Sequence, residues 1–223
     1  MALFLGFPIS LEFHARVAES IRRVRQEPPA SKHRQLVTDT IIEMTETGIT
    51  FFFSEMVGRM QLGSAADRVA GIALKTVRRG LHLIIERVGW ALHEEQFYPL
   101  VDFLETIPLQ DGGDCYVAFP ATPELEDQLN AYIDAVHNRP PATDHAWQCH
   151  DLIVAFKHAS LDYYFRQSTK RLGVHGWAEK AVVIGINIAD GASNQPLKRV
   201  IPQLSEESLI SIADFYRGIM LEK

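Results

Sequence analysis

Two arginines occupy positions where a charged side chain would lie among apolar ones. Arg59 falls within the apolar arc of a predicted helix, one turn after Glu55, and Arg171 follows 112 residues later. An unpaired buried guanidinium is very costly, so each arginine needs a carboxylate or carbonyl oxygens nearby. Asp102 and Asp214 recur at the same spacing and are the predicted partners. We therefore predict one structural ion pair in each half of the chain, with ligand binding as the alternative role.

Acidic and histidine side chains follow one side of a predicted helix in the second half. Asp144, Asp151, His158 and Asp162 share this side, and the last two are one turn apart, a spacing that can bind a metal. Di-metal helical bundles use Glu-x-x-His from paired helices, and this motif does not occur. Glycine-rich phosphate loops, His-Glu-x-x-His and Gly-x-Ser-x-Gly do not occur either. We interpret the residues as a solvated acidic stripe and predict no metal site.

Two aromatic runs are also separated by 112 residues. Phe51 to Phe53 correspond to Tyr163 to Phe165, and both runs fall within long predicted helices. Six aromatic side chains at matching positions can meet between the two halves and line a pocket. Phe52 and Tyr164 are the predicted lining residues, and ordinary core packing explains the runs equally well.

The sequence reads as two copies of one unit. Shifting it by 112 positions without a gap aligns residues 27–33 with residues 139–145 and residues 92–95 with residues 204–207. A period of this length indicates a duplicated unit of domain size rather than an array of short repeats. We predict a first repeat, residues 1–111, and a second, residues 112–223, related by a pseudo-twofold axis as a fused homodimer would be.

Each repeat is predicted to contain one strand and about four helices, which makes the fold a mainly α bundle. Apolar runs that end at proline, residues 3–7 and 116–119, predict short buried strands that pair with each other. Ser10 and Thr122 occupy N-cap positions of the first helices, which a Pro-Pro pair ends. Ser31 and Thr143 are predicted to cap helices of some 30 residues. The first of these forms a long antiparallel hairpin with residues 64–91, where small residues follow one stripe. The last helices are predicted over residues 94–107 and 206–221.

The two copies differ most after Asp190. Residues 181–188 are rich in β-branched side chains, but they align with the helical residues 69–76, so we predict a helix. Glycine and proline then appear in residues 191–196, which predicts a loop that shortens the second hairpin. Loops on rigid scaffolds often carry function. An enzyme site at residues 191–202 would draw on four polar residues: His82, His175, Asn187 and Asp190.

Length and composition predict a soluble globular protein. The chain has 223 residues, 47% of them hydrophobic and 22% charged, which is close to the average of folded proteins. The formal charge of -6 argues against a nucleic-acid partner. Two cysteines without a Cys-x-x-Cys pair favour a reducing compartment, so we expect a cytoplasmic protein. The apolar start lacks the features of a signal peptide, and no stretch of about 20 apolar residues predicts a membrane span.

Three functions are compatible with these features. The leading hypothesis is a non-catalytic module that binds a protein partner or a small apolar ligand. The alternatives are an enzyme with its site in residues 191–202 or between the repeats, and a membrane-surface protein held by the apolar start and Arg22 to Arg25. No motif identifies a cofactor. The residues assigned to a ligand site are Phe52, Glu55, Arg59, Tyr164, Arg171, His175, Asn187 and Asp190.

Overall fold

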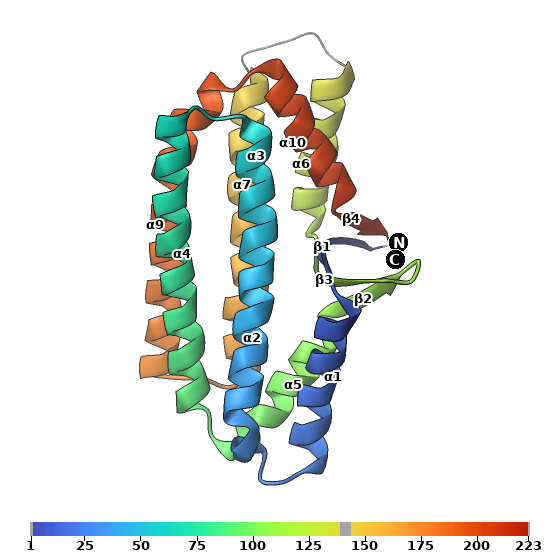
Figure 1. Cartoon of the computed structure of the whole chain (residues 1–223), viewed down its shortest axis with the longest axis vertical. Helices are drawn as coiled ribbons and strands as arrows, with labels where there is room; N and C mark the ends of the chain where they lie inside the picture. Colours follow the sequence, from blue (N-terminus) through green and yellow to red (C-terminus); the bar gives the residue numbers. More distant parts are fainter. Residues whose placement is uncertain (1, 139–143, 223) are drawn as a thin grey trace.

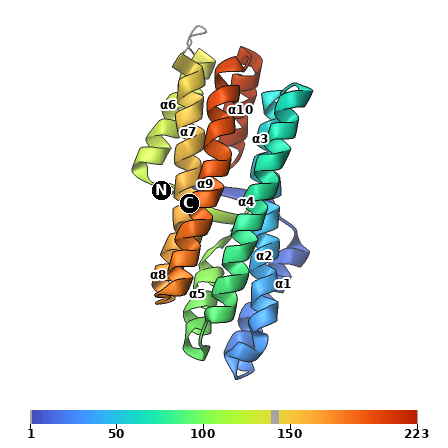
Figure 2. The same cartoon turned by 90° about the vertical axis from the view of Figure 1, so that its left-hand side faces the viewer.

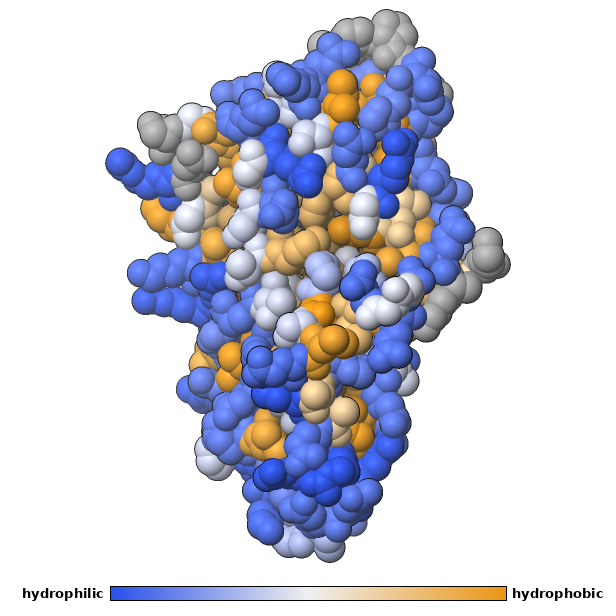
Figure 3. Space-filling view, turned by 45° about the vertical axis from the view of Figure 1, so that its right-hand side comes forward, coloured by the Kyte–Doolittle hydropathy of each residue, from blue (hydrophilic) through white to orange (hydrophobic). Residues whose placement is uncertain are grey.

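The chain is mainly helical, as predicted, and carries a small sheet at one side (Figure 1). The computed structural model describes residues 2–138 and 144–222, without the side chains of residues 64–67, 69, 144, 192 and 193. The two ends of the chain lie next to each other beside the sheet (Figure 1). On the side shown in Figure 3, hydrophobic residues reach the surface near mid-height, with hydrophilic residues around them.

The helices form three layers (Figure 1). The outer layer consists of α4 (Ser64–Ala91) and α9 (Trp177–Val200). The central layer consists of α2 (Arg34–Ile49) with α3 (Glu55–Met60), and of α7 (Asp144–Leu161) with α8 (Ser168–Arg171). The third layer holds the sheet together with α1 (Leu11–Gln26), α5 (Phe97–Thr106), α6 (Pro123–Asn138) and α10 (Glu206–Gly218).

Four antiparallel strands form the sheet of the described residues, in the order β2-β3-β1-β4. The predicted strands are its two central ones, β1 (Leu3–Ile9) and β3 (Asp114–Pro120), and they pair with each other. The short edge strands β2 (Pro108–Asp111) and β4 (Met220–Glu222) lie where the last helices were predicted to continue. These helices end early because the outer edges of β1 and β3 carry backbone groups that need partners, which β4 and β2 supply.

Two of the predicted helix caps are confirmed and one is wrong. Ser10 Oγ accepts a hydrogen bond from the Phe13 N–H at 3.0 Å, and Thr122 Oγ1 accepts one from the Leu125 N–H at 3.3 Å. Ser31 does not cap α2, because it lies in a 3-10 turn that precedes this helix. There its N–H donates to Glu94 Oε2 at 2.8 Å. Thr143, the fourth predicted cap, lies outside the described residues.

The long central helices each contain a π-helical turn that periodicity did not predict. The turn at residues 50–54 joins α2 to α3, and the turn at residues 162–167 joins α7 to α8. Each turn inserts its residues without breaking the helix, so the first central helix continues to Met60. The next residue, Gln61, takes the left-handed conformation that was expected of Gly63, and Gly63 becomes the N-cap of α4.

The outer helices α4 and α9 pack side by side at glycines (Figure 2). A Cβ built on Gly80 would lie 3.4 Å from Ile188 Cγ2, and one built on Gly185 would lie 2.1 Å from Ile84 Cδ1. At Gly80, the stripe of small residues on α4 therefore faces α9. The predicted contact with the preceding helix also exists, since a Cβ on Gly89 would lie 2.7 Å from Thr38 Oγ1 of α2.

The predicted loop over residues 191–202 is wrong. Helix α9 continues to Val200 with Pro196 inside it, and a 3-10 turn, Ile201–Gln203, follows. Proline removes one backbone donor and disfavours a helix interior. Burial outweighs this cost here, because Ile201 is fully buried and Leu197 and Val200 pack against the core that it belongs to.

The close approach of α4 and α9 gives a stability prediction. Gly185→Ala forces the new methyl group against the buried side chain of Ile84, and we expect unfolding free energy to fall by about 1 to 3 kcal/mol. Gly191→Ala, on the same helix, meets nothing within 4 Å. This control should be neutral or stabilising by up to about 1 kcal/mol. Urea denaturation followed by circular dichroism measures both, and equal effects would contradict the packing described.

Candidate functional site

The two aromatic runs lie in the π-helical turns of the central helices. Such turns are rare and frequently occur at functional sites, because they change the direction in which side chains leave the helix. Phe51 contacts Phe7 of β1 and Phe215 of α10, with ring centroids 6.2 and 5.7 Å apart. Phe52 contacts Phe156 of α7 at 4.9 Å. The turn therefore directs aromatic rings toward both neighbouring layers.

Aromatic side chains from both halves form one connected cluster. In the second half, Tyr163 contacts Phe103 at 5.5 Å and Phe119 at 6.1 Å, and Tyr164 contacts Phe119 at 5.8 Å. The cluster joins ten rings: Phe7, Phe51, Phe52, Phe103, Phe119, Phe156, Tyr163, Tyr164, Phe215 and Tyr216. Four of the six aromatics predicted to meet belong to it.

A cavity of about 280 Å³ lies between the central and outer layers. Its wall comes from α2, α3, α4, α7 and α9 and from both π-helical turns. The aromatic residues on the wall are Phe7, Phe52, Phe53, Phe156, Tyr164, Phe165 and Tyr216. Almost all the other lining side chains are aliphatic, so the cavity offers an apolar environment with few hydrogen-bonding groups. Phe52 and Tyr164 line the pocket as the sequence predicts.

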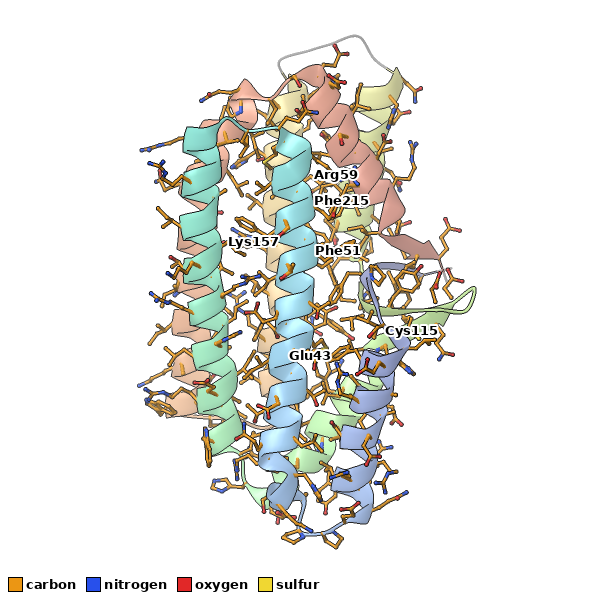
Figure 4. All side chains as sticks on the ribbon, viewed as in Figure 1. Glu43, Phe51, Arg59, Cys115, Lys157 and Phe215 are labelled. Atoms are coloured by element: carbon orange, nitrogen blue, oxygen red, sulfur yellow. The ribbon has the colours of Figure 1, made fainter. Side chains whose placement is uncertain are left out.

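A polar cluster borders the cavity on the side of α7 and α9. Lys157, which also lines the cavity, places its Nζ 2.5 Å from Asp190 Oδ1 and donates to Asn194 Oδ1 (Figure 4). His158 Nε2 lies 2.9 Å from the same oxygen of Asp190. Burial acts to raise the pKa of Asp190, but hydrogen bonds from Lys157 and His158 outweigh it and lower this pKa. The charge of Lys157 is therefore balanced within the protein.

A second polar cluster lies between α2 and α4. Glu46 Oε2 is 2.9 Å from Arg78 Nε, and Glu46 Oε1 is 2.6 Å from His82 Nε2. Arg78 also donates to Thr50 Oγ1, at the start of the π-helical turn, at 2.7 Å. His82 is thus bound to α2, whereas Asp190 is bound to α7. The grouping of His82 with Asp190 in one enzyme site, which the sequence suggested, does not occur.

The predicted ion pairs of the two arginines are wrong. Arg59 donates to the Ser211 carbonyl at 3.0 Å, lies over the Phe215 ring at 5.3 Å, and is 3.7 Å from Glu55 (Figure 4). Arg171 lies over Phe103 at 5.3 Å and is exposed. Neither arginine lines the cavity.

The carboxylates expected to pair with these arginines point elsewhere. Asp214 Oδ1 is 3.1 Å from His137 Nε2, and Asp102 Oδ1 is 2.7 Å from an Arg25 nitrogen. Each aspartate directly precedes the phenylalanine that the arginine covers. Neighbouring residues on a helix point in directions about 100° apart, so the phenylalanine faces inward and the aspartate faces solvent.

The remaining predicted site residues do not line the cavity. His175 lies in the turn before α9 and Asn187 lies on α9, and both are exposed. The predicted membrane anchor is also unavailable. The apolar start forms the largely buried strand β1, and Arg22 and Arg25 are bound by carboxylates of the same layer.

The residues that sequence reasoning missed have identifiable signals. Lys157 lies one turn from Ile153 and from Leu161, inside the apolar arc of α7, and this position could have singled it out. Tyr216 had no comparable signal, because α10 alone does not show what its inner face meets. Within the described residues, no group of three or more His, Cys, Asp or Glu side chains could hold a metal ion.

Comparisons place no known protein beside this chain. No protein-family model, curated protein or solved structure gives a significant match. Among the helices that the structure describes, none is both long and apolar enough to cross a bilayer. The geometry of the site is therefore the basis for any functional conclusion.

The lowered pKa of Asp190 predicts a pH-dependent contribution to stability. Because the folded-state pKa lies below the usual value of 3.8, the charged carboxylate stabilises the fold above that pH. This contribution is lost as the pH falls through the folded-state pKa. We expect Asp190→Asn to lower unfolding free energy by about 1 to 2 kcal/mol at neutral pH, as for a lost hydrogen bond to a charged group, and by much less in acid.

Denaturant titrations of Asp190→Asn at several pH values measure this effect. Asp127→Asn, at an exposed position on α6, is the control and should change stability by less than about 0.5 kcal/mol at every pH. A difference between Asp190→Asn and wild type that is independent of pH would exclude the electrostatic explanation.

Proposed function

We propose that this protein binds a small, uncharged, mainly hydrocarbon ligand in the cavity between its central and outer layers. The observation that supports this most directly is an apolar cavity of about 280 Å³ bordered by two aromatic π-helical turns. Protein interiors are normally close-packed, with few voids larger than a water molecule. An apolar space of this size at the centre of the fold is therefore better explained by an occupant than by packing alone.

The size and lining of the cavity limit the ligand. An engineered apolar cavity of about 150 Å³ binds benzene, so a space nearly twice as large suits a ligand of about ten to twelve carbon atoms. Lys157 is the charged residue among the described lining, and Asp190 balances it. A free acid would therefore gain no net attraction here, which favours an alcohol, ketone or hydrocarbon.

Binding without catalysis agrees with the state of the buried reactive groups. Burial raises the pKa of the Cys149 thiol to about 12, so this thiol is protonated at neutral pH and is a poor nucleophile. Burial also raises the pKa values of Tyr164 and Tyr216, which line the cavity. Neutral hydroxyl groups suit an apolar ligand better than they suit general acid–base chemistry.

We also propose that the chain is a duplicated unit with a pseudo-twofold axis through the sheet and the cavity. Strand register supports this, because Gly6 pairs with Ala118, its counterpart at a spacing of 112. Pairing of Leu5 with Met220 corresponds in the same way to pairing of Val117 with Pro108.

Side-chain contacts repeat at the same spacing. Arg59 over Phe215 corresponds to Arg171 over Phe103. Arg25 with Asp102 corresponds to His137 with Asp214. On this proposal the cavity lies on the axis, so each chain holds one shared site. A crystal structure in which residues 3–60 and 115–172 overlay poorly would contradict the duplication.

The ligand proposal is tested with 1-decanol, whose ten carbons match the cavity. Isothermal titration calorimetry and thermal shift should detect binding to wild type. Decanol at about 100 times its Kd would stabilise the fold by about 2.7 kcal/mol. Ala73 is buried on the cavity wall, so Ala73→Leu fills part of the space and should weaken binding at least about tenfold, as a loss of roughly 1.4 kcal/mol does.

Ala18→Leu is the matched control for this experiment, because Ala18 is exposed on α1, away from the cavity. It adds the same atoms and should leave decanol binding unchanged. If decanol binds neither wild type nor Ala18→Leu, or binds Ala73→Leu as tightly as wild type, the cavity is not the binding site.

A further inference from the structure

Exposed large apolar side chains gather on the outer layer. Of the ten that the described residues contain, seven lie on α4 and α9: Ile72, Leu83, Trp90, Trp177, Val183, Ile184 and Ile188. These two helices have 28 and 24 residues, less than a quarter of the chain. Scattered single apolar residues need no explanation, but a concentration on one pair of helices marks an interaction surface. We call this surface the α4–α9 outer face.

The same two helices carry the opposite charge from the rest of the molecule. They contain eight Lys or Arg and four Asp or Glu, a net charge of +4, whereas the whole chain is at -6 and the remainder therefore at -10. Among their described residues, seven basic side chains are exposed, namely Arg68, Lys75, Arg79, Arg87, Lys180, Lys198 and Arg199. Their exposed acidic counterparts are Glu86 and Glu179. The outer face therefore combines apolar and basic groups.

The shape of this face suits a flat partner. Helices α4 and α9 lie antiparallel and side by side (Figure 2), and 28 residues at 1.5 Å each make α4 about 42 Å long. Trp90 ends α4 and Trp177 begins α9, so both lie at the same end of the face, where they are 70% and 55% exposed. Arg87 lies over the Trp177 ring at 5.5 Å. Tryptophan is enriched where proteins meet the headgroup region of a bilayer.

We propose that the α4–α9 outer face binds the surface of an anionic lipid bilayer. Lys and Arg on the polar positions with Trp, Leu and Ile on the others are typical of helices that lie in a membrane interface. Anionic headgroups attract basic clusters, and the net charge of +4 complements them. A second copy of this chain is a poorer partner, because two faces of the same charge repel and protein interfaces are depleted in lysine.

This surface also connects with the interior. The inner sides of the same helices line the cavity through Ala70, Ala73, Val77, Leu81, Ala189 and Leu197. A bilayer on the outer face would therefore be separated from the cavity by one layer of helices. Membrane binding does not depend on the ligand proposal, since it uses the opposite side of α4 and α9.

Vesicle flotation tests the proposal with the full chain. Large unilamellar vesicles of phosphatidylcholine with about 30% phosphatidylserine should carry most of the protein, and vesicles of phosphatidylcholine alone should carry little. Raising the salt from about 50 to about 500 mM should release it, because screening weakens attraction between exposed charges. Tryptophan emission should shift to shorter wavelength on binding.

Two variants with matched controls locate the surface. Lys75→Glu with Arg79→Glu reverses two charges on the face, and Lys32→Glu with Arg217→Glu makes the same change at exposed positions elsewhere. Ile184→Asp is matched by Leu11→Asp, which is 68% exposed on α1. The face variants should lose at least about tenfold in binding to anionic vesicles, and the controls should bind as wild type does.

Each outcome decides the question. Circular dichroism first confirms that all four variants fold as wild type. Equal loss in face variants and controls, or equal flotation with neutral and anionic vesicles, overturns the proposal. So does failure to float combined with a dimer, seen by analytical ultracentrifugation, that the face variants abolish. Decanol binding is measured without vesicles, so its failure and the failure of membrane binding are told apart.

Discussion

Backbone pairing between β1 and β3 is the constraint on which the rest of the structure depends. These strands begin the two halves of the chain and lie at the centre of the sheet, with Gly6 opposite Ala118. Gly6 is needed at this point, because a Cβ there would lie 2.9 Å from the Ala118 Cβ. The pairing directs α1 and α6 away from opposite ends of the sheet (Figure 1), and the central helices then cover it. Phe7 and Phe119 connect the sheet to the aromatic runs of those helices.

The aromatic cluster explains why an interior cavity can persist. Ten large rings support one another on the sheet side of the central helices, while smaller side chains such as Ala70 and Ala73 face them from α4. The glycine contacts at Gly80 and Gly185 hold α4 and α9 together as a layer of their own. This layer does not collapse onto the central helices, because polar clusters around Glu46 and Asp190 join the two layers at defined distances. The space left between them is the proposed ligand site.

The outer layer has two different faces, and the proposals of this article follow from that difference. Its inner face is apolar and small, which suits a cavity wall. Its outer face carries exposed isoleucine, leucine and tryptophan among basic residues, which suits an anionic lipid surface. A protein that binds an uncharged hydrocarbon ligand and also contacts a bilayer could exchange the ligand with the membrane. The distribution of charge, +4 on two helices and -10 elsewhere, would orient the chain for that exchange.

Local features were predictable from the sequence because their causes lie within a few residues. Ser10 and Thr122 begin helices through hydrogen bonds three residues away, and residues 181–188 are helical as their aligned partners indicated. Phe52 and Tyr164 were recognised as pocket residues from their spacing. Tertiary structure alone decided the partner of Arg59, 152 residues away at Ser211, and the continuation of α9 through Pro196. It also decided the edge strands and the cavity. These depend on surfaces brought together from distant parts of the chain, where burial and hydrogen-bond satisfaction outweigh local propensity.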